Sequence, residues 1–359
     1  MHQPSLPGEG IRSAGRGPLA RALAASRADT LARLADWQAD GRLDLPYRAT
    51  LNPPLWEAGH VGWFQAHWTT RNAAWRDGTR ADPSAPLPHA DDALYDSSRV
   101  AHRTRWSLPL PAIDMLRDQL ARQLDATLAL LAQAGDDDAS LYFFRLVLLH
   151  EDMHHEAAIY MLRSEGVAVS DTRWRPQAEA GARDEIAFGP GRVRLGHAGP
   201  GFGFDNELPP HEVEVPAFAI DRRVVTWAEY LPFVDAGHAP RPAVVGAPAE
   251  AACGMARADA AAWCAWAGRR LPTEAEWQRA AAHPAFGWGR VWEWTATPFA
   301  PFPGFEPHPY RDYSAPWFDG RPVLKGASWA TQPRLVDARY RNFFDAGRTD
   351  LLAGFRSAR

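Results

Sequence analysis

Cysteine is scarce in this chain, which has only two among its 359 residues, Cys253 and Cys264. Two cysteines cannot build the disulfide framework of a small secreted protein, so a reducing compartment, the cytoplasm, is expected. The chain also lacks an uninterrupted apolar run of membrane length and, near Met1, the apolar core of a signal peptide. Neither sign of charge dominates, because the formal net charge is −4. This balance argues against a nucleic acid or an anionic membrane as the partner and leaves small molecules.

The length suffices for two domains, and the texture of the sequence changes along it. Residues 1–16 carry Pro, Gly, Ser and charge without periodicity and are expected to form a disordered leader. Helical periodicity follows in residues 17–170, the composition of a linker in 171–185, and short β-like runs between Gly and Pro in 186–359. We therefore predict an α+β protein of two domains, with a helical first domain.

Four segments of the first part repeat apolar residues at helical spacing. They are Pro18–Asp40, Asn52–Trp68, Pro111–Ala134 and a segment that begins at about Ser140 and runs through Leu162. Helices with such stripes form a bundle, and bundles build metal sites from side chains that face inward. A long polar connection, residues 77–108, precedes the third segment, and a loop of this length in a compact domain is usually functional.

The fourth segment contains a candidate metal site. His150 and His154 are four residues apart, so on a helix their rings lie on one face. Two neutral imidazoles can bind one metal ion, and Glu156 is close enough to orient such a ligand. Helix histidines with satisfied hydrogen bonds are the ordinary alternative. His60, on the apolar side of the second helix, supplies a third imidazole, whereas His67 lies one residue off that register.

Three imidazoles from two helices favour a catalytic site over a structural one. They leave coordination positions open for substrate and dioxygen, whereas a structural zinc site is closed and usually contains cysteine.

The second part combines short strands with two helices. The β-like runs are 192–195, 212–215, 218–220 and 322–324, and the helices span 258–266 and 273–282. Thr273 and Glu276 have the spacing of a capping box. This pattern indicates an α+β domain with irregular loops.

Motifs in both parts resemble known families. Those of the second part resemble the formylglycine-generating-enzyme-like fold, related to C-type lectin domains: Gly201-Phe-Gly-Phe-Asp-Asn-Glu207, Ala267-Gly-Arg-Arg-Leu-Pro-Thr-Glu-Ala-Glu-Trp277, Val291-Trp-Glu-Trp-Thr295, Leu324-Lys-Gly-Ala-Ser-Trp-Ala330 and Ala353-Gly-Phe-Arg356. The first part, with Gly59-His60 and the spacing of His150, His154 and Glu156, looks like a DinB-type four-helix bundle. In this order they resemble the ergothioneine sulfoxide synthases and the related selenoneine synthases. The Trp-Glu-Trp motif (292–294) and the Gly-Ala-Ser-Trp motif (326–329) of the second part are expected to have a structural role in the fold.

The resemblance implies a nonheme Fe(II) oxidoreductase whose iron ligands are His60, His150 and His154. Such an enzyme uses dioxygen to join sulfur or selenium to the imidazole carbon between the nitrogens of hercynine (trimethylhistidine). The matching motif places Asn342, Phe343 and, on the histidine helix, Met153 at hercynine. Asn342 can hydrogen-bond hercynine, and Phe343 can hold its trimethylammonium by a cation–π contact.

The departures from the family pattern lie on the side of the sulfur or selenium donor. The histidine helix reads His-Glu-Asp-Met-His where sulfoxide synthases have His-Glu-Gln-Gln-His, and Phe344 stands where relatives that use γ-glutamylcysteine have Asp. Phe cannot pair with an ammonium by charge. The resemblance therefore favours the selenoneine branch, in which the donor is a selenosugar without an amino group. Arg348 and Arg103 are expected beside Phe344 at the donor.

The active-site tyrosine is left open by the sequence. The Tyr-Pro-Gly-Phe segment of some relatives is Phe302-Pro-Gly-Phe305 here, and Tyr310 and Tyr313 remain nearby as candidates.

Four other functions are the alternatives. An ergothioneine sulfoxide synthase would form the C–S bond with γ-glutamylcysteine or cysteine, and a DinB-type zinc thiol transferase would use the same imidazoles without the second domain. A formylglycine-generating oxidase needs a cysteine pair near the C-terminus, whereas Cys253 and Cys264 lie upstream and are expected to be core thiols. A binding module with an inactive bundle and a lectin-like pocket is the last. In the long connection, Arg99, Arg103 and Arg105 could bind an anionic group of a donor or be solvated.

Overall fold

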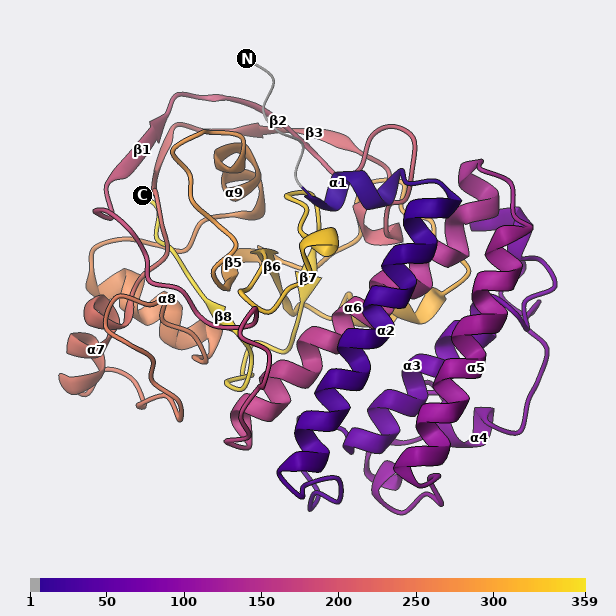
Figure 1. Ribbon diagram of the computed structural model, residues 1–359. Coiled ribbons are helices and arrows are strands. Elements are labelled where there is room, and N and C mark those ends of the chain that lie inside the picture. Colours follow the sequence, from indigo (N-terminus) through magenta and orange to yellow (C-terminus); the bar gives the residue numbers. More distant parts are fainter. Residues whose placement is uncertain (1–6) are drawn as a thin grey trace.

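The computed structural model describes residues 7–359, which form a helical bundle and a C-terminal domain packed side by side (Figure 1). The helices of the first part are α1 (Pro7–Arg12), α2 (Arg16–Ala39), α3 (Pro54–Trp68), α4 (Asp92–Tyr95), α5 (Ile113–Ala132) and α6 (Asp138–Ser164), with 3-10 turns η1 (Trp75–Arg80) and η2 (His102–Trp106).

The bundle consists of α2, α3, α5 and α6, the four helices expected from the sequence. Their ends lie within a few residues of the predicted ones. The helix α6 begins where the carboxylate of Asp137 accepts a hydrogen bond from Ser140 N at 3.0 Å, which satisfies one of the free N–H groups of the first turn. Most side chains of α3 and α6 are buried, so these two helices form the centre of the bundle. The prediction of a four-helix bundle is confirmed.

The C-terminal domain is an α+β structure with short strands. It contains β1 (Glu185–Phe188), β2 (Gly191–Leu195), η3 (Asp205–Glu207), β3 (His211–Val215), β4 (Phe218–Asp221), α7 (Trp227–Asp235), α8 (Arg257–Trp266), α9 (Glu274–Ala281), β5 (Trp292–Pro298), η4 (Arg311–Tyr313), η5 (Ala315–Trp317), β6 (Pro322–Gly326), η6 (Pro333–Leu335), β7 (Asn342–Phe343) and β8 (Ala353–Gly354). The pairs β1–β4 and β2–β3 are antiparallel ribbons, and a four-stranded sheet has the order β7-β6-β5-β8. Its β5–β8 pair is parallel and its other pairs are antiparallel.

The strands and helices predicted for this domain are confirmed at β2, β3, β4, β6, α8 and α9, the last with Thr273 and Glu276 in a capping box. The helix α7 and the strands β1, β5, β7 and β8 were not predicted. The two cysteines are buried and free, as expected of core thiols. No helix among residues 7–359 is long and apolar enough to cross a membrane.

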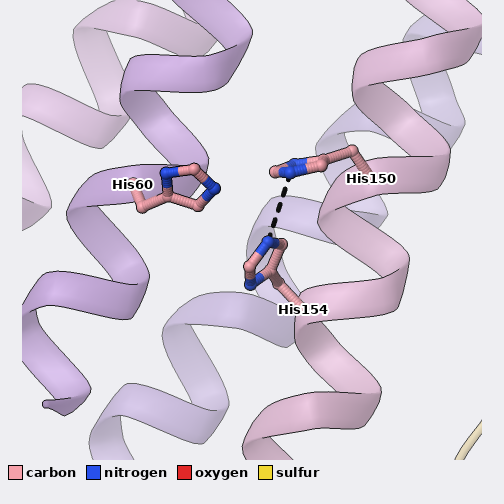
Figure 2. Close-up of side chains that lie close together, drawn as sticks. All are labelled: His60, His150 and His154. Carbon is pink, nitrogen blue, oxygen red and sulfur yellow. Dashed lines mark hydrogen bonds between the residues drawn. The ribbon is translucent and has the colours of Figure 1, made fainter. Parts of the chain in front are cut away.

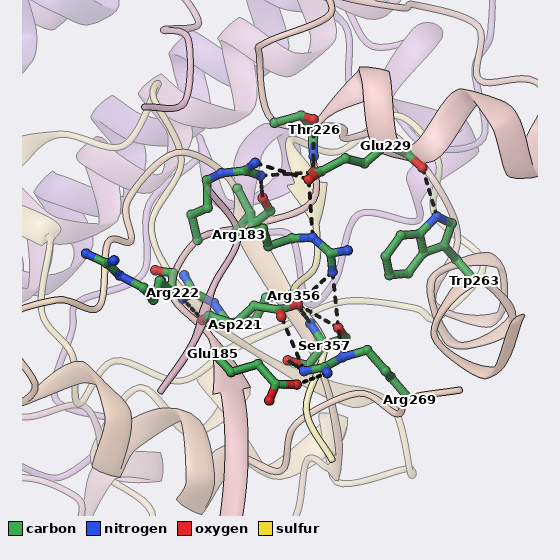
Figure 3. Close-up of polar contacts among 12 residues, drawn as sticks. Arg183, Glu185, Asp221, Arg222, Thr226, Glu229, Trp263, Arg269, Arg356 and Ser357 are labelled. Carbon is green, nitrogen blue, oxygen red and sulfur yellow. Dashed lines mark hydrogen bonds and ion pairs between the residues drawn. The ribbon is translucent and has the colours of Figure 1, made fainter. Parts of the chain in front are cut away.

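A network of hydrogen bonds and ion pairs connects the last residues of the chain to β4 (Figure 3). The Asp221 carboxylate accepts hydrogen bonds from Ser357 Oγ at 2.6 Å and Ser357 N at 3.1 Å, and it pairs with Arg183 at 2.9 Å. The fully buried Arg356 donates to the backbone oxygen of Asp221 and forms an ion pair with Glu293 of β5. The network therefore joins the C-terminal end to both the ribbon and the sheet.

The predicted disordered leader is wrong from residue 7 onward, and residues 1–6 lie outside the described part. Residues 7–12 form α1, and the Arg12 guanidinium is buried in ion pairs with Glu207 at 2.6 Å and Asp337 at 3.2 Å. Composition alone missed this because the partners lie about 200 residues or more away. The predicted linker, residues 171–185, contains turns, one isolated bridge at Ala178 and the first residue of β1.

Polar side chains of α6 join the bundle to the C-terminal domain. Asp152, fully buried, accepts two hydrogen bonds of 2.6 Å from Arg334 of η6. One turn on, the Glu156 carboxylate accepts hydrogen bonds from Trp292 Nε1 at 2.7 Å and Thr331 Oγ1 at 2.9 Å, and from Ser328 Oγ. The helix that carries two of the candidate ligands is therefore held by both parts of the protein.

Candidate active site

Three histidine side chains meet between α3 and α6. His60 projects from α3, and His150 and His154 project from α6 toward it (Figure 2). One ring nitrogen of each lies within 4.8 Å of the others, and the Nε2 atoms of His150 and His154 are 3.2 Å apart. Two nitrogens that bind one metal at roughly 2.1 Å and near a right angle are roughly 3 Å apart, so this spacing suits shared coordination.

Two of the rings are held by hydrogen bonds on their outer nitrogens. The Nδ1–H of His60 donates to the backbone oxygen of Tyr95 at 2.8 Å, and that of His154 donates to Glu57 Oε1 at 2.5 Å. Each bond selects the tautomer with a free lone pair on Nε2, which is the usual arrangement of metal-binding histidines. Gly59 allows the first of these bonds, because a Cβ there would lie 2.2 Å from the Tyr95 ring.

Burial favours the neutral form of His60 and of His150. It lowers the pKa of His60 to about 3, helped by the neighbouring His154, and it lowers the pKa of His150 well below the ordinary value. Burial alone would raise the pKa of Glu57, but His154 beside it lowers that pKa to about 2. The neutral forms of His60 and His150 and the ionised form of Glu57 are therefore favoured, and these charge states suit metal binding.

Aromatic rings enclose the site on two sides. The Trp56 ring stacks on His60 with centroids 4.9 Å apart and an interplanar angle of 7°, and the Phe64 ring stacks on His150 at 3.5 Å and 7°. Both aromatic residues are 1% exposed, so these faces exclude water.

The carboxylate that orients a histidine is Glu57, and the prediction for Glu156 is wrong. Glu156 lies two residues beyond His154, which turns its side chain away toward Trp292 and the C-terminal domain. Glu57 lies one turn before His60 on α3 and reaches across to His154 on the other helix. The sequence signal for this role was an acidic residue, Glu57, among the apolar residues of α3.

A cavity of about 80 Å³ lies between α6 and the C-terminal domain. This Asn342 cavity is lined by Met153, Glu156, Tyr160, Trp292, Leu335, Tyr340, Asn342, Phe344, Leu351 and Leu352. Met153 precedes His154 on α6, and its Sδ accepts a hydrogen bond from Tyr340 Oη at 3.1 Å. The structure thus brings together Met153, Asn342 and Phe344 from the predicted set.

Phe343 does not line the Asn342 cavity. It stacks on Phe299 at 4.1 Å and lies 6.0 Å from the ring of Tyr313. Successive side chains of a strand point to opposite faces, so Asn342 and Phe343 of β7 cannot face one cavity. The predicted cation–π contact of Phe343 therefore cannot form with a ligand in the Asn342 cavity.

The predicted donor arginines differ in position. The Arg348 guanidinium lies 5.6 Å from the centre of the Phe344 ring and pairs with Asp350 at 2.5 Å, so these two residues do lie together. Arg103 is exposed on the ring of Tyr47, outside the residues that line the Asn342 cavity. The prediction for Arg103 is not supported by this position.

The neighbouring Arg105 lies nearer the histidines. It covers the Trp56 ring at 3.9 Å and donates to Asn52 Oδ1 at 2.8 Å, and Asn52 donates to Glu57 at 2.7 Å. Arg99 is exposed. The long connection therefore reaches the site at two points. Arg105 contacts Glu57 through Asn52, and the Tyr95 carbonyl accepts the hydrogen bond from His60.

Of the tyrosine candidates, Tyr310 is the one beside a histidine. Its ring lies 6.3 Å from His150 and 4.9 Å from Phe64, and burial raises its pKa. Tyr313 lies one step farther away and donates a hydrogen bond to Tyr340 Oη at 3.1 Å. Phe302 packs beneath Arg341 and against His211, in the core of the C-terminal domain.

Comparison with known proteins identifies the family. Over 427 aligned positions the chain is 30% identical to the hercynine oxygenase of Mycobacterium tuberculosis (strain ATCC 25618 / H37Rv), covering 95% of this chain and 98% of that one. The chain belongs to the hercynine oxygenase family. It is also 30% identical to the hercynine oxygenase of Mycolicibacterium thermoresistibile, over 97% of this chain and 96% of that one. For the hercynine oxygenase of Mycolicibacterium smegmatis the identity is 29%, over 96% and 99%.

Part of the C-terminal domain of this hercynine oxygenase family member also matches a family model. Residues 171–288 match the sulfatase-modifying factor enzyme 1-like domain. This match bears out the formylglycine-generating-enzyme-like fold expected for the second part, and the two-domain α+β organisation is that of the structure.

The donor atoms of the site fit a divalent transition metal. Three imidazoles with no thiolate suit iron, zinc or copper, and the described residues contain no other cluster of three His, Cys, Asp or Glu side chains with such spacing. Nδ1 of His150 has no hydrogen-bond partner among them, so the third ring is positioned by stacking on Phe64.

Proposed function

We propose that this protein is a nonheme Fe(II) oxygenase that joins the imidazole of hercynine to the selenium of a selenosugar, as in selenoneine biosynthesis. The observation that carries the proposal is the convergence of His60, His150 and His154 in a chain of the hercynine oxygenase family. Relatives that bear the name hercynine oxygenase make hercynine the first choice of substrate.

The Asn342 cavity is the proposed hercynine site. The rings of Tyr160, Trp292 and Tyr340 face it and can hold a trimethylammonium group by cation–π contacts, while the Asn342 amide can hydrogen-bond the substrate. Met153, which lines the cavity, directly precedes His154 on α6, and we propose that the hercynine imidazole points toward the histidines with its ammonium end away from them.

The reaction that we propose replaces the imidazole C–H bond and the donor Se–H bond with a C–Se bond. One oxygen atom of dioxygen is transferred to selenium, and the other takes up the two released protons and leaves as water. Iron held by the three histidines would supply the activation of dioxygen. The chain supplies the remaining parts: Trp56 and Phe64 exclude water, and the buried phenol of Tyr310 supplies a proton beside His150.

The surroundings of Phe344 support a donor without an ammonium group. Phe344 offers no charge, and the nearby Asp350 carboxylate is already paired with Arg348. An ammonium brought here would lose its hydration, and the carboxylate that lines the cavity, Glu156, already accepts hydrogen bonds from Trp292, Ser328 and Thr331. A selenol also ionises at lower pH than a thiol and needs less help from a base. γ-Glutamylcysteine or cysteine as donor, with a sulfoxide as product, is the second candidate, which the names of the relatives favour.

A competition experiment separates the two donors. Protein loaded with Fe(II) is given hercynine, air, and equal concentrations of a selenosugar and γ-glutamylcysteine, and the products are identified by mass. We expect the selenium product to predominate. A predominance of the sulfoxide would reject the selenium assignment and leave the iron and hercynine assignments standing.

The metal assignment has its own test. The protein is purified without oxygen and its iron, zinc and copper contents are measured. We expect His60→Ala to lose most of the iron and the turnover together, while His67→Ala, which alters a histidine packed on Trp63, keeps both. Full iron in His60→Ala, or zinc as the metal that supports activity, would contradict the proposal.

A further inference from the structure

The segment 308–314 carries Tyr310 to the histidines without the support of a sheet. It is described in full, it lies outside the strands, and only the short η4 turn forms within it. Its backbone hydrogen bonds include two local ones, Arg311 N to Pro309 O at 3.0 Å and Tyr313 N to Tyr310 O at 3.2 Å. The position of Tyr310 therefore depends on side-chain contacts at the ends of the segment.

One such contact comes from Asp205 in η3. Ser314, at the end of the segment and fully buried, donates to Asp205 Oδ1 at 2.5 Å. Burial raises the pKa of Asp205 to about 6, and the hydrogen bond from the Ser314 hydroxyl opposes that rise. This buried carboxylate therefore holds the Ser314 end of the segment.

The support behind Asp205 is rigid. Glu207, in the same 3-10 turn, is fully buried, pairs with Arg12 at 2.6 Å and accepts a hydrogen bond from Phe204 N at 2.9 Å. Because Glu207 anchors the turn that carries Asp205, the Asp205 carboxylate can hold a loop that forms no backbone hydrogen-bond ladder.

The second contact comes from the histidine helix itself. The hydroxyl of Tyr142 on α6 lies 3.0 Å from Nδ1 of His308, and the two rings meet edge to face at 5.5 Å. Tyr142 is eight residues, about two turns, before His150 on the same helix. The segment is therefore tied to the helix that carries two of the candidate metal ligands.

We propose that Asp205 and Tyr142 are positioning residues that hold the segment 308–314 so that Tyr310 faces His150. The proposal rests on the proposed function, in which Tyr310 supplies a proton, and it assigns to Asp205 and Tyr142 an effect on turnover without contact with substrate. Loss of either support should let the Tyr310 phenol move by an ångström or more, a displacement that costs roughly 10- to 100-fold in rate.

The first measurement is hydrogen–deuterium exchange of the metal-free protein. Asp205→Asn and Tyr142→Phe should each speed exchange of the amides in residues 308–314. Tyr230→Phe is the matched control, because it removes a hydroxyl that is buried in the C-terminal domain and has no hydrogen-bond partner among the described residues. Unchanged exchange in Asp205→Asn and Tyr142→Phe overturns the positioning role, whether or not hercynine is the substrate.

The second measurement separates kcat from KM in iron-loaded protein. Asp205→Asn and Tyr142→Phe should lower kcat roughly 10- to 100-fold, no further than Tyr310→Phe, with the KM for hercynine and the iron content unchanged. Ser314→Ala combined with Asp205→Asn should be no worse than Asp205→Asn alone. The proposal is overturned if Asp205→Asn and Tyr142→Phe have the same kcat as Tyr230→Phe. It is also overturned if their iron content falls by the same factor as their kcat. A wild-type protein inactive with hercynine would reject the proposed function, and the exchange measurement would still decide the positioning.

Discussion

At the scale of the residue, each imidazole of the site is fixed by a different kind of partner. His60 has a backbone carbonyl, His154 has a carboxylate, and His150 has the flat face of Phe64. The hydrogen-bonded partners select a tautomer and make the ring a better metal ligand, whereas the stacked ring only sets orientation. The three histidines are therefore not equivalent, and Glu57 is the partner whose alteration should affect the metal most directly.

Glu57→Gln should weaken iron binding roughly 10- to 100-fold, because a neutral amide is a poorer acceptor for the His154 N–H than a carboxylate. Iron retained after anaerobic dialysis against a chelator measures the effect. Glu156→Gln is the matched control: its carboxylate contacts Trp292, Ser328 and Thr331, so that variant should melt at a lower temperature and keep its iron affinity. Equal losses of iron affinity in the two variants would show that Glu57 has no special role.

At the scale of the element, α7 shows how a capping box can stabilise a short helix that sequence periodicity missed. Pro232 lies inside α7, which argues against a helix in the sequence. Glu229 nevertheless accepts hydrogen bonds from Thr226 N at 2.8 Å and Arg223 Nη1 at 2.9 Å, within the network of Figure 3. The charge on Glu229 therefore stabilises the start of the helix.

The stability contributed by Glu229 should depend on pH. Burial alone would raise its pKa, but the hydrogen bonds from Arg223 and Thr226 lower it to about 2. A folded-state pKa below the unfolded value of about 4.3 means that the contribution is complete above that pH and is lost as the pH falls toward 2. Glu229→Gln should lower the free energy of unfolding at pH 7 by about 1–2 kcal/mol, and the difference should shrink between pH 5 and pH 3.

Urea denaturation at pH 7, 5, 4 and 3 measures this difference. Glu214→Gln, which removes an exposed ion pair with Arg192 on the β2–β3 ribbon, serves as the control and should change little at any pH. A Glu229→Gln difference that is constant from pH 7 to pH 3 would contradict the assignment.

At the scale of the whole molecule, α6 belongs to both parts. Its Asp152 pairs with Arg334 of the C-terminal domain, and the same carboxylate accepts a hydrogen bond from Ser26 Oγ of α2 at 2.6 Å. The residue that replaces a family glutamine at this point is thus a link between the bundle and the second domain. We expect the two parts to unfold together for this reason.

Arg334→Met should destabilise the protein by about 3–5 kcal/mol, because it leaves the buried Asp152 carboxylate without its partner. Circular dichroism at 222 nm reports chiefly the bundle, whereas tryptophan fluorescence reports both parts because tryptophans lie in each. Both transitions should move together. Arg241→Met, which breaks an exposed pair with Asp235, is the control. A bundle transition that stays in place while the fluorescence transition shifts would show that the two parts are independent.

Much of this architecture is visible in the sequence because it depends on local periodicity. The apolar repeats predicted α2, α3, α5 and α6, and the spacing of His150 and His154 placed both rings on one face of a helix. The capping box at Thr273 predicted the start of α9. The resemblance of the motifs pointed to the family that the comparison with known proteins then showed.

Only the tertiary structure decided what lies opposite each of these side chains. Spacing along a helix shows that two residues share a face, but the partner comes from another element, as Glu57 does for His154 and Trp292 does for Glu156. The strand β7 was too short to predict, so the opposite faces of Asn342 and Phe343 emerged only with its pairing to β6. Arg12 was unrecognisable as a buried residue because its partners, Glu207 and Asp337, are brought to it by folding alone. Local order follows from neighbours in the chain, whereas the chemistry of a site follows from which surfaces pack together.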